Sequence, residues 1–494
     1  MTSTPTAAPA PAEPTATPAP APLAIKTITL RPGERLTDEM ISRAGALPAE
    51  VMASAAQIVD TVRAGGDEAV RDYERRFDRV DLADFRVPAE VLDRACDPDR
   101  VDPAFLASCE KAARQIRDFH ERELEQSWFM TRPDGTILGQ KVTPLESVGI
   151  YVPGGRAQYP STVLMNAIPA KVAGVERIVM VTPPQADGGA LSPYTLCAAK
   201  VAGVDEIYTV GGAQAIAALA YGTASIPRVS KITGPGNAYV AAAKRLVSGD
   251  VGIDMVAGPS EVCVLADATA EPRLVAIDLM AQAEHDPLAT CYLVTTDPAL
   301  PVAVLPRIEE YLAQSPRRDI TEASLANKGV IVVCADTQQA IDAVNAIAPE
   351  HLEVQMAGGM ELLGRIKNAG AIFVGTWSSE PLGDYVAGPN HTLPTGGTAK
   401  FSSPLSVEQF VKKSSVICYS YEGLDADCDD VVTLAEAEGL WSHARSAAMR
   451  REVRADQFAA QACTTATACK PAEACQSVEA CEPAGTGQLA VGGR

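Results

Sequence analysis

The chain has 494 residues, of which 47% are apolar and 21% are charged, and its formal net charge is −20. It is too long for one hydrophobic core and has the composition of an ordinary globular protein, so we expect several domains. The acidic balance argues against nucleic acid and anionic membranes as partners, because both attract basic surfaces. Neither a signal peptide nor an apolar run of the ~18 residues that a membrane helix needs is visible, so the sequence predicts a cytoplasmic protein.

The twelve cysteines fall into two groups. Eight occur singly and are typical of small buried apolar residues in a reducing compartment. The other four recur at every sixth residue near the end of the chain, without CxxC pairs or a nearby histidine, so a zinc ribbon is not expected there. They are Cys463, Cys469, Cys475 and Cys481. Residues 1–24 and 458–494 are rich in small residues and proline and predict disordered tails, to which no function is assigned.

Residues 36–120 have a helical pattern, with apolar side chains at three- and four-residue spacing through 51–62 and 105–119. His120, near the end of this segment, is interpreted as a helix-surface or packing histidine. Beyond Val148 the pattern changes to short apolar strands that alternate with alanine-rich helices. This alternation is typical of βαβ units, and it predicts a parallel sheet.

Glycines mark three of the expected strand-to-helix junctions, at Gly154-Gly155, Gly211-Gly212 and Gly234-Pro235-Gly236. Glycine at such a junction lets the backbone N–H groups of a helix N-terminus approach an anion such as a pyrophosphate. None of the three has the GxGxxG spacing of the dinucleotide fingerprint, so tight turns without a ligand explain them equally well.

The segment GPSEVCVLADATAEPRLVAIDLMAQAEHDP, residues 258–287, predicts a strand over 261–266 and a helix that begins near Pro272 and stops at Asp286-Pro287. Gln282 and His285 are three residues apart, so a helix places both on one face. They are interpreted either as exposed residues of a helix end or as half of a metal site.

Other histidines also lie near acidic residues. Glu350 and His351 are adjacent, and such a pair can supply a general base and a water-activating carboxylate, although adjacency alone also occurs by chance. Asp384 and His391 lie in a Gly/Pro-rich loop over 383–397, after a predicted strand at 369–375, where α/β enzymes place working groups. Glu438 and His443 occur near a helix start. Two histidines, one aspartate and one glutamine can bind zinc and leave room for a substrate, so the residues alone predict a metal-dependent α/β enzyme with a dinucleotide as a candidate cofactor.

From roughly Ile25 to Arg454 the chain resembles the histidinol dehydrogenase family. The resemblance rests on eight motifs in order, and their joint order over the chain is highly specific. The motifs are GIYVPGG, VGGAQAIAALAYGT, ITGPGNAYVAAAK, AGPSEV, QAEHD, IAPEHLEV, GDYVAGPNHTLPT and EGLWSH. The resemblance implies the zinc- and NAD-dependent oxidation of L-histidinol to L-histidine in two hydride transfers through the aldehyde L-histidinal, the last steps of histidine biosynthesis.

By this resemblance the fold has two Rossmann-like α/β domains with parallel sheets and small helical terminal segments. The expected parts are a small N-terminal segment at 25–47, a first α/β domain at 48–150 and 262–402, a second, NAD-side domain at 151–261, and a C-terminal helical segment at 403–457. A homodimer with shared active sites is also implied, in which the partner supplies the closing helix with His443.

Carried over residue by residue, the resemblance implies four groups of site residues. The zinc ligands are Gln282, His285, Asp384 and His443, and the same four, with Ser260, His351, His391 and Glu438, contact the substrate. The catalytic pair is Glu350 and His351. The nucleotide contacts are Tyr151, Gln214 and Asn237.

This assignment makes chemical sense, because histidinol carries an imidazole and an amine that are good zinc donors. His351 is expected to remove the alcohol proton as hydride leaves, and Glu350 to activate the water that hydrates the aldehyde. The alternatives are a dehydrogenase of the same fold that oxidises another alcohol such as a sulfonated diol, a zinc hydrolase, and a binding protein with a structural metal. Glu438 and His391, which are expected to read the amine and imidazole of the substrate, favour histidinol.

Overall fold

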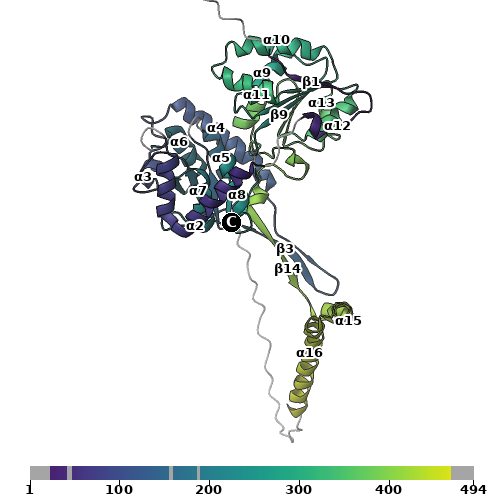
Figure 1. Cartoon of the computed structure of the whole chain (residues 1–494). Helices are drawn as coiled ribbons and strands as arrows, with labels where there is room; N and C mark the ends of the chain where they lie inside the picture. The colour runs from purple at the N-terminus through teal and green to yellow at the C-terminus, as the bar shows by residue number, and fades with distance from the viewer. Residues whose placement is uncertain (1–22, 42–46, 155–158, 186–189, 257, 469–494) are drawn as a thin grey trace, which may run out of the picture. The chain divides into compact units, whose positions relative to one another are not determined.

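The computed structural model describes residues 23–41, 47–154, 159–185, 190–256 and 258–468 (Figure 1). Most of the predicted N-terminal tail and the part of the cysteine-containing tail beyond residue 468 lie outside the described residues. The chain divides into two compact units, each described by itself below. The first unit comprises residues up to 126 and 142–413, and the second comprises 127–141 and 414 onwards.

A five-stranded parallel sheet forms the first half of the first unit, in the order β6-β5-β4-β7-β8. In chain order this is 3-2-1-4-5, so the strand order reverses between β4 and β7, the position at which such sheets bind ligands. The strands are nearly continuous apolar runs, as expected for a sheet that helices cover on both faces. They are β4 (Ser147–Tyr151), β5 (Arg177–Thr182), β6 (Glu206–Thr209), β7 (Lys231–Thr233) and β8 (Gly252–Ile253).

Two hydrophobic cores lie on the two faces of this sheet. Side chains of α2, α7 and α8 form one core, and side chains of α4, α5 and α6 form the other. Figure 1 shows these helices grouped around the sheet. The helices are α2 (Ala49–Phe77), α3 (Ala89–Asp93), α4 (Pro103–His120), α5 (Pro160–Ala173), α6 (Pro193–Ala202), α7 (Gly212–Tyr221) and α8 (Ala238–Val247).

A second parallel sheet, of six strands, has the order β1-β11-β10-β9-β12-β13. Without the edge strand β1 this is again 3-2-1-4-5 in chain order, with the reversal between β9 and β12. On β9, Val262 and Val264 face one core, whereas Cys263 and Leu265 face the other, as the two-residue period of a strand requires. The strands are β1 (Lys26–Thr29), β9 (Glu261–Ala266), β10 (Thr290–Thr295), β11 (Val330–Val333), β12 (His351–Gln355) and β13 (Ala371–Val374).

Helices again cover both faces. In Figure 1, α9, α10 and α11 lie on one side of the six-stranded sheet, and α12 and α13 lie on the other. The other helices of the first unit have between 4 and 13 residues. The helices are α1 (Asp38–Ile41), α9 (Pro272–Ala283), α10 (Leu300–Leu312), α11 (Arg318–Lys328), α12 (Thr337–Ile347), α13 (Gly359–Leu362) and α14 (Glu380–Tyr385), with 3-10 turns η1 (Glu121–Glu123), η2 (Thr398–Lys400) and η3 (Val407–Phe410).

The fold class predicted from the sequence is confirmed, but the structure groups the segments differently. Helices α2 and α4, expected in the first domain, pack on the five-stranded sheet, because their apolar faces share its two cores. Strand β4, also expected in the first domain, is the central strand of the same sheet. The N-terminal segment is not separate, since β1 pairs with β11 and forms the edge of the six-stranded sheet.

The second unit contains a three-stranded sheet, in the order β14-β3-β2, and two helices. The prediction of a largely helical segment after residue 403 was therefore wrong for β14, which pairs with β3 at the edge of this sheet. Helix α16 also continues past residue 457, the expected start of the tail, because that stretch is rich in alanine. The elements are β2 (Trp128–Thr131), β3 (Ile137–Pro144), β14 (Val411–Cys418), α15 (Tyr421–Ala437) and α16 (Trp441–Ala468).

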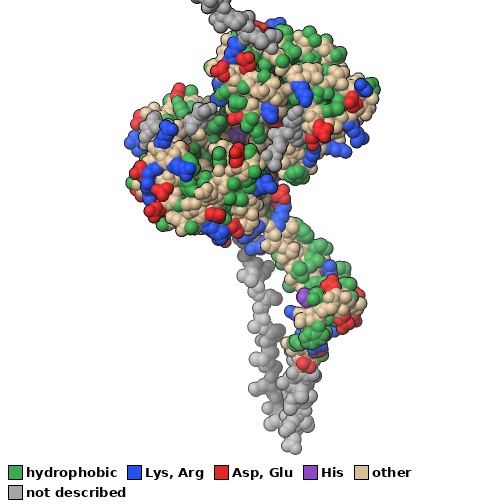
Figure 2. All heavy atoms as spheres, in the orientation of Figure 1, with side chains coloured by type: hydrophobic (Ala, Val, Ile, Leu, Met, Phe, Trp, Pro, Cys, Tyr) green, Lys and Arg blue, Asp and Glu red, His purple; other side chains and the backbone are tan. Residues whose placement is uncertain are grey.

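Acidic and basic side chains are interspersed over the visible face of the molecule (Figure 2). The net negative charge is therefore spread rather than gathered into one acidic surface on this face. Among the described residues, no helix combines the length and apolar character that a membrane span requires.

Gly234 and Gly249 provide a matched test of backbone constraint near β7 and β8. Both have positive φ, +111° and +107°, which strains any other residue. A Cβ on Gly234 would clash with the carbonyl oxygen of Tyr151, whereas one on Gly249 would meet nothing within 4 Å. We expect Gly249→Ala to cost about 1 kcal/mol and Gly234→Ala about 3 kcal/mol or more. Thermal unfolding followed by circular dichroism checks this order, and equal losses would contradict the close approach of β4 and the turn at Gly234.

Candidate active site

His351 is the centre of the polar cluster at the six-stranded sheet. It begins β12, is 4% exposed, and its Nδ1 lies 3.1 Å from the side-chain amide of Gln282 on α9. If the amide is rotated so that its NH2 group faces Nδ1, the NH2 group also lies 3.3 Å from the Glu261 carbonyl oxygen and 3.3 Å from the Glu380 carboxylate, and it can donate to both. A neutral Nδ1 accepts from that NH2, whereas an Nδ1–H donates to the amide oxygen, so a rotation of the Gln282 amide accommodates either protonation state of His351.

Asp384 on α14 completes the cluster from the other side. Its Oδ1 lies 3.6 Å from His351 Nε2, an atom that is buried and has no hydrogen-bond partner among the described residues. Burial raises the pKa of Asp384, but the contact with His351 and the nearby His391 and His285 outweigh burial, so the pKa is lowered. The structure thus brings together Gln282, His285, His351, Asp384 and His391, which are separated by up to about a hundred residues in the chain.

Two buried glutamates face His351. Glu350 is 3.8 Å from its Nδ1 and accepts a hydrogen bond from the Glu261 N–H at 2.9 Å; burial raises the pKa of Glu350 to about 8. Glu380 is 3.9 Å from Nδ1, and burial raises its pKa to about 7. Burial lowers the pKa of His351, but Glu380, Glu350 and Asp384 together raise it well above its ordinary value. The cluster is therefore suited to holding a proton or a cation.

Glu380 was missed in the sequence analysis. It is 2% exposed, and its Oε2 has no hydrogen-bond partner among the described residues. His351, Glu380 and Asp384 each offer a ligand atom, and these atoms all lie within 4.8 Å of one another. The signal that could have identified Glu380 is its spacing of four residues before Asp384, which places both carboxylates on one face of α14.

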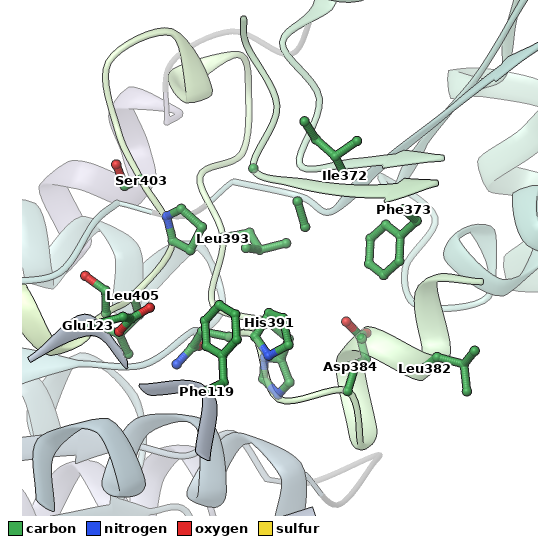
Figure 3. A pocket seen from close by; sticks show the side chains of 18 of the residues that line it. Phe119, Glu123, Ile372, Phe373, Leu382, Asp384, His391, Leu393, Ser403 and Leu405 are labelled. Atoms are coloured by element: carbon green, nitrogen blue, oxygen red, sulfur yellow. The ribbon is translucent and has the colours of Figure 1, made fainter. Parts of the chain in front are cut away.

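A cavity of about 710 Å³ opens beside this cluster. Figure 3 shows that the side chains of Asp384 and His391 lie at the same hollow, which Phe119, Phe373 and Leu393 also line. The cavity therefore combines an apolar wall with a carboxylate and an imidazole, as small-molecule sites commonly do. Ser260, the predicted substrate contact, directly precedes β9, and its carbonyl oxygen accepts the Thr290 N–H.

The cluster lies at the edge of the six-stranded sheet where two neighbouring strands begin. Glu350, His351 and Glu261 stand at the amino ends of β12 and β9, not at the carboxyl ends, because α9 and α14 return their C-terminal halves to that edge. His285 also lies just beyond the end of α9 rather than on its face.

His120 is buried, not on a helix surface. Its Nδ1 lies 2.7 Å from the Glu123 carboxylate, and its Nε2 faces the amide of Asn390 at 3.5 Å. Asn390 directly precedes His391. The packing interpretation of His120 is confirmed, and His120 supports the loop that carries His391.

The predicted nucleotide contacts cluster at the carboxyl edge of the five-stranded sheet. Tyr151 ends β4 and is 4% exposed, and its hydroxyl accepts the Gly212 N–H at 3.1 Å. Gln214, on α7, is 1% exposed. Asn237 is exposed and caps α8 by accepting the N–H groups of Tyr239 and Val240. Tyr151 lies at the reversal of strand order, where a dinucleotide is expected.

Glu74, on α2, meets this cluster from the helical layer. It is fully buried, and its Oε1 accepts the Gly211 N–H at 3.1 Å and the Gln214 side-chain NH2 at 2.9 Å. The N–H groups of the Gly211-Gly212 junction are therefore occupied by Glu74 and Tyr151, as the tight-turn interpretation of this junction requires. At Gly234, the N–H donates to Asp254 at 2.8 Å, so this junction is also held by protein groups.

Glu438 and His443 lie in the second unit. Glu438 follows the last residue of α15, His443 is in the first turn of α16, and both are exposed. The first unit alone therefore supplies three of the four predicted zinc ligands, Gln282, His285 and Asp384.

Two doubly wound α/β sheets, one of them with a buried histidine–carboxylate cluster that could hold a metal ion beside a cavity, are typical of an α/β enzyme. A family model described as histidinol dehydrogenase matches residues 42–451. The chain is 52% identical over 419 residues to histidinol dehydrogenase of Carboxydothermus hydrogenoformans, covering 84% of this chain and 97% of that protein. It is also 52% identical over 422 residues to the Bacillus subtilis enzyme, covering 85% and 98%.

Among solved structures, histidinol dehydrogenase from Elizabethkingia anophelis superposes with a TM-score of 0.82 at 34% identity, covering 87% of this chain and 98% of that chain. The chain therefore belongs to the histidinol dehydrogenase family of oxidoreductases, which performs the final steps of histidine biosynthesis. The predicted family is confirmed, and another alcohol as substrate finds no support in these relatives.

The buried Glu74 predicts a pH-dependent stability. Burial, assisted by the neighbouring Asp78, raises the pKa of Glu74 from 4.5 to about 8. The folded state therefore favours the protonated form, so the stabilisation is complete below about pH 4.5 and is lost as the pH rises towards 8. Glu74→Gln, which keeps an acceptor but cannot ionise, should unfold at a higher temperature than the parent chain at pH 8 and lose this advantage at pH 5. Melting curves at several pH values test this, and a constant difference would contradict an ionisable Glu74.

Proposed function

We propose that this chain oxidises L-histidinol to L-histidine with NAD as hydride acceptor and one zinc ion per subunit. The single observation that carries the proposal is the convergence of Gln282, His351 and Asp384 beside a small-molecule cavity, in a chain of the histidinol dehydrogenase family. The apolar wall and the imidazole of His391 suit a substrate with one imidazole ring.

The residues present fit a divalent cation. Imidazole nitrogen, carboxylate and amide oxygen form the N/O donor set that zinc accepts, and the buried His351 Nε2 and Glu380 Oε2 have no hydrogen-bond partner among the described residues. From the family resemblance we propose Gln282, His285 and Asp384 as ligands, with His443 of the partner subunit as the fourth. The groups whose ligand atoms lie within 4.8 Å of one another are His351, Glu380 and Asp384, so Asp384 is common to both sets. A bound zinc ion supplies Lewis-acid contacts to the amino alcohol, which hold it in place for hydride transfer.

The proton transfers are assigned to the catalytic pair. In its neutral form, which the positive charge of a bound cation would favour, His351 removes the hydroxyl proton while the carbon-bound hydride leaves, which gives the aldehyde. Glu350 then takes a proton from the water that adds to the aldehyde carbon. His351 acts again as the hydrated aldehyde loses the second hydride and becomes the carboxylate. The overall reaction consumes one water and two NAD and yields two NADH, so the electrons balance.

Substrate recognition and nucleotide binding are divided between the two sheets. Ser260, His391 and Glu438 are assigned to the substrate, and Tyr151, Gln214 and Asn237 to NAD.

We also propose a homodimer in the cytoplasm. Large apolar side chains of the second unit are exposed, including Ile417 at 68%, Leu434 at 67% and Trp441 at 70%, and exposed apolar side chains that gather in a patch mark interfaces.

The stoichiometry of NADH is the most direct test of the reaction. We expect two NADH per histidinol consumed, because the aldehyde stays bound for the second oxidation. Activity should be lost after chelation and restored by zinc, since the donor set suits this ion. Absorbance at the NADH band with limiting histidinol measures the ratio. One NADH per histidinol would mean that the reaction stops at the aldehyde, and none would refute the proposal.

The role of His351 needs a separate test, because the structure places it within reach of both a proton and a cation. We expect His351→Asn to lower kcat by about 10³-fold or more, as loss of a general base does, while one zinc per subunit remains bound. Asp384→Asn is the control and should lose zinc. Metal content by atomic emission separates the two outcomes, and loss of zinc in His351→Asn would make His351 a ligand rather than the base.

A further inference from the structure

We propose that Glu74 is a positioning residue for the nucleotide: from α2 it holds Gln214 and the Gly211 N–H in the geometry that NAD requires. The inference rests on the assignment of Gln214 to the nucleotide under the proposed function. No site residue was predicted on α2, so Glu74 extends the predicted site to this helix.

Burial and two hydrogen bonds hold the Glu74 side chain in one position. Glu74 lies in the last turn of α2, next to Tyr73 of the apolar core, where a carboxyl group without hydrogen bonds is costly. Its Oε1 accepts from two donors, the Gly211 N–H at 3.1 Å and the Gln214 NH2 at 2.9 Å. One side chain thus fixes both the junction between β6 and α7 and the first turn of α7.

Tyr151 is fixed by the same junction. The Gly212 N–H donates to its hydroxyl at 3.1 Å, so Glu74, Gly211-Gly212, Gln214 and Tyr151 form one connected set of hydrogen bonds. Glu74 contacts Gln214 directly, whereas Tyr151 is linked to Glu74 only through the backbone of Gly211-Gly212. Gln214 Oε1 and Glu74 Oε2 are buried and have no hydrogen-bond partner among the described residues, so both oxygens of this set can accept a further hydrogen bond.

The charge of Glu74 is consistent with this role. The N–H groups that precede α7 have no partner within the helix, and the Glu74 carboxyl group accepts one of them, that of Gly211. Because burial raises the pKa of Glu74 to about 8, the neutral acid predominates at pH 7. The side chain can therefore accept hydrogen bonds without placing a full negative charge beside the phosphates of a dinucleotide. A glutamine, which is neutral and similar in shape, should perform the same function.

The test compares Glu74→Ala with Glu74→Gln in the zinc-loaded enzyme. We expect Glu74→Ala to raise KM for NAD about tenfold, the effect of losing a buried hydrogen-bonded partner, with kcat and KM for histidinol nearly unchanged. Glu74→Gln should restore KM for NAD to within about twofold of the parent value. The control is Asp67→Asn, which alters a carboxylate on the same helix that binds Ser225 Oγ at 2.6 Å and should leave KM for NAD unchanged.

A double-mutant cycle with Gln214→Ala isolates the coupling. If Glu74 acts through Gln214, the double variant should have nearly the same KM for NAD as Gln214→Ala alone. Additive effects, an unchanged KM for NAD in Glu74→Ala, or failure of Glu74→Gln to restore it would overturn the inference. An unchanged KM in Gln214→Ala would overturn it as well, and would identify the assignment of Gln214 as the cause. Production of NADH by all variants keeps the proposed reaction distinguishable from this inference.

Discussion

The contact between His351 Nε2 and the Asp384 carboxylate, 3.6 Å long, is the interaction on which the site depends. Asp384 reaches it from α14, His351 from the start of β12, and Gln282 from the far end of α9. Each group is costly to bury alone, and the cost is offset because each offers the others a charge or a hydrogen bond. Burial raises the pKa values of Glu350 and Glu380, and their attraction to His351 offsets part of that rise, while the same attraction raises the pKa of His351.

The β-strand period and the helix period align these groups. Glu261 and His351 each begin a strand at the same edge of the sheet, and β9 and β12 are neighbours in register. Glu380 and Asp384 are four residues apart on α14, so their carboxylates point to one side. The side chains of β9, β12, α9 and α14 therefore lie close together, although about a hundred residues separate Gln282 from Asp384 in the chain.

Much of this could be predicted from the sequence, for identifiable reasons. The apolar runs of β9 and β10, bounded by Gly, Pro and Asp, define strands at 261–266 and 290–295, and Pro272 marks the start of α9. Glu350 and His351 were recognised because ordered motifs carry them. The convergence itself could not be deduced, since no local pattern reports which strands are neighbours. Helix α2 was grouped with the wrong sheet because its amphipathic pattern shows that one face is buried but not against what.

The two sheets of the first unit share the 3-2-1-4-5 order but place their polar groups at opposite ends of the strands. In the five-stranded sheet Tyr151 and the Gly211-Gly212 and Gly234 junctions follow the strands, as the rule for open α/β sheets expects. In the six-stranded sheet Glu261, Glu350 and His351 precede or begin theirs. The amino ends of β9 and β12 instead bring carboxylates and the His351 imidazole together, a donor set that suits a cation. Under the proposed function, one topology serves an anionic cofactor at the carboxyl edge of one sheet and a metal at the amino edge of the other.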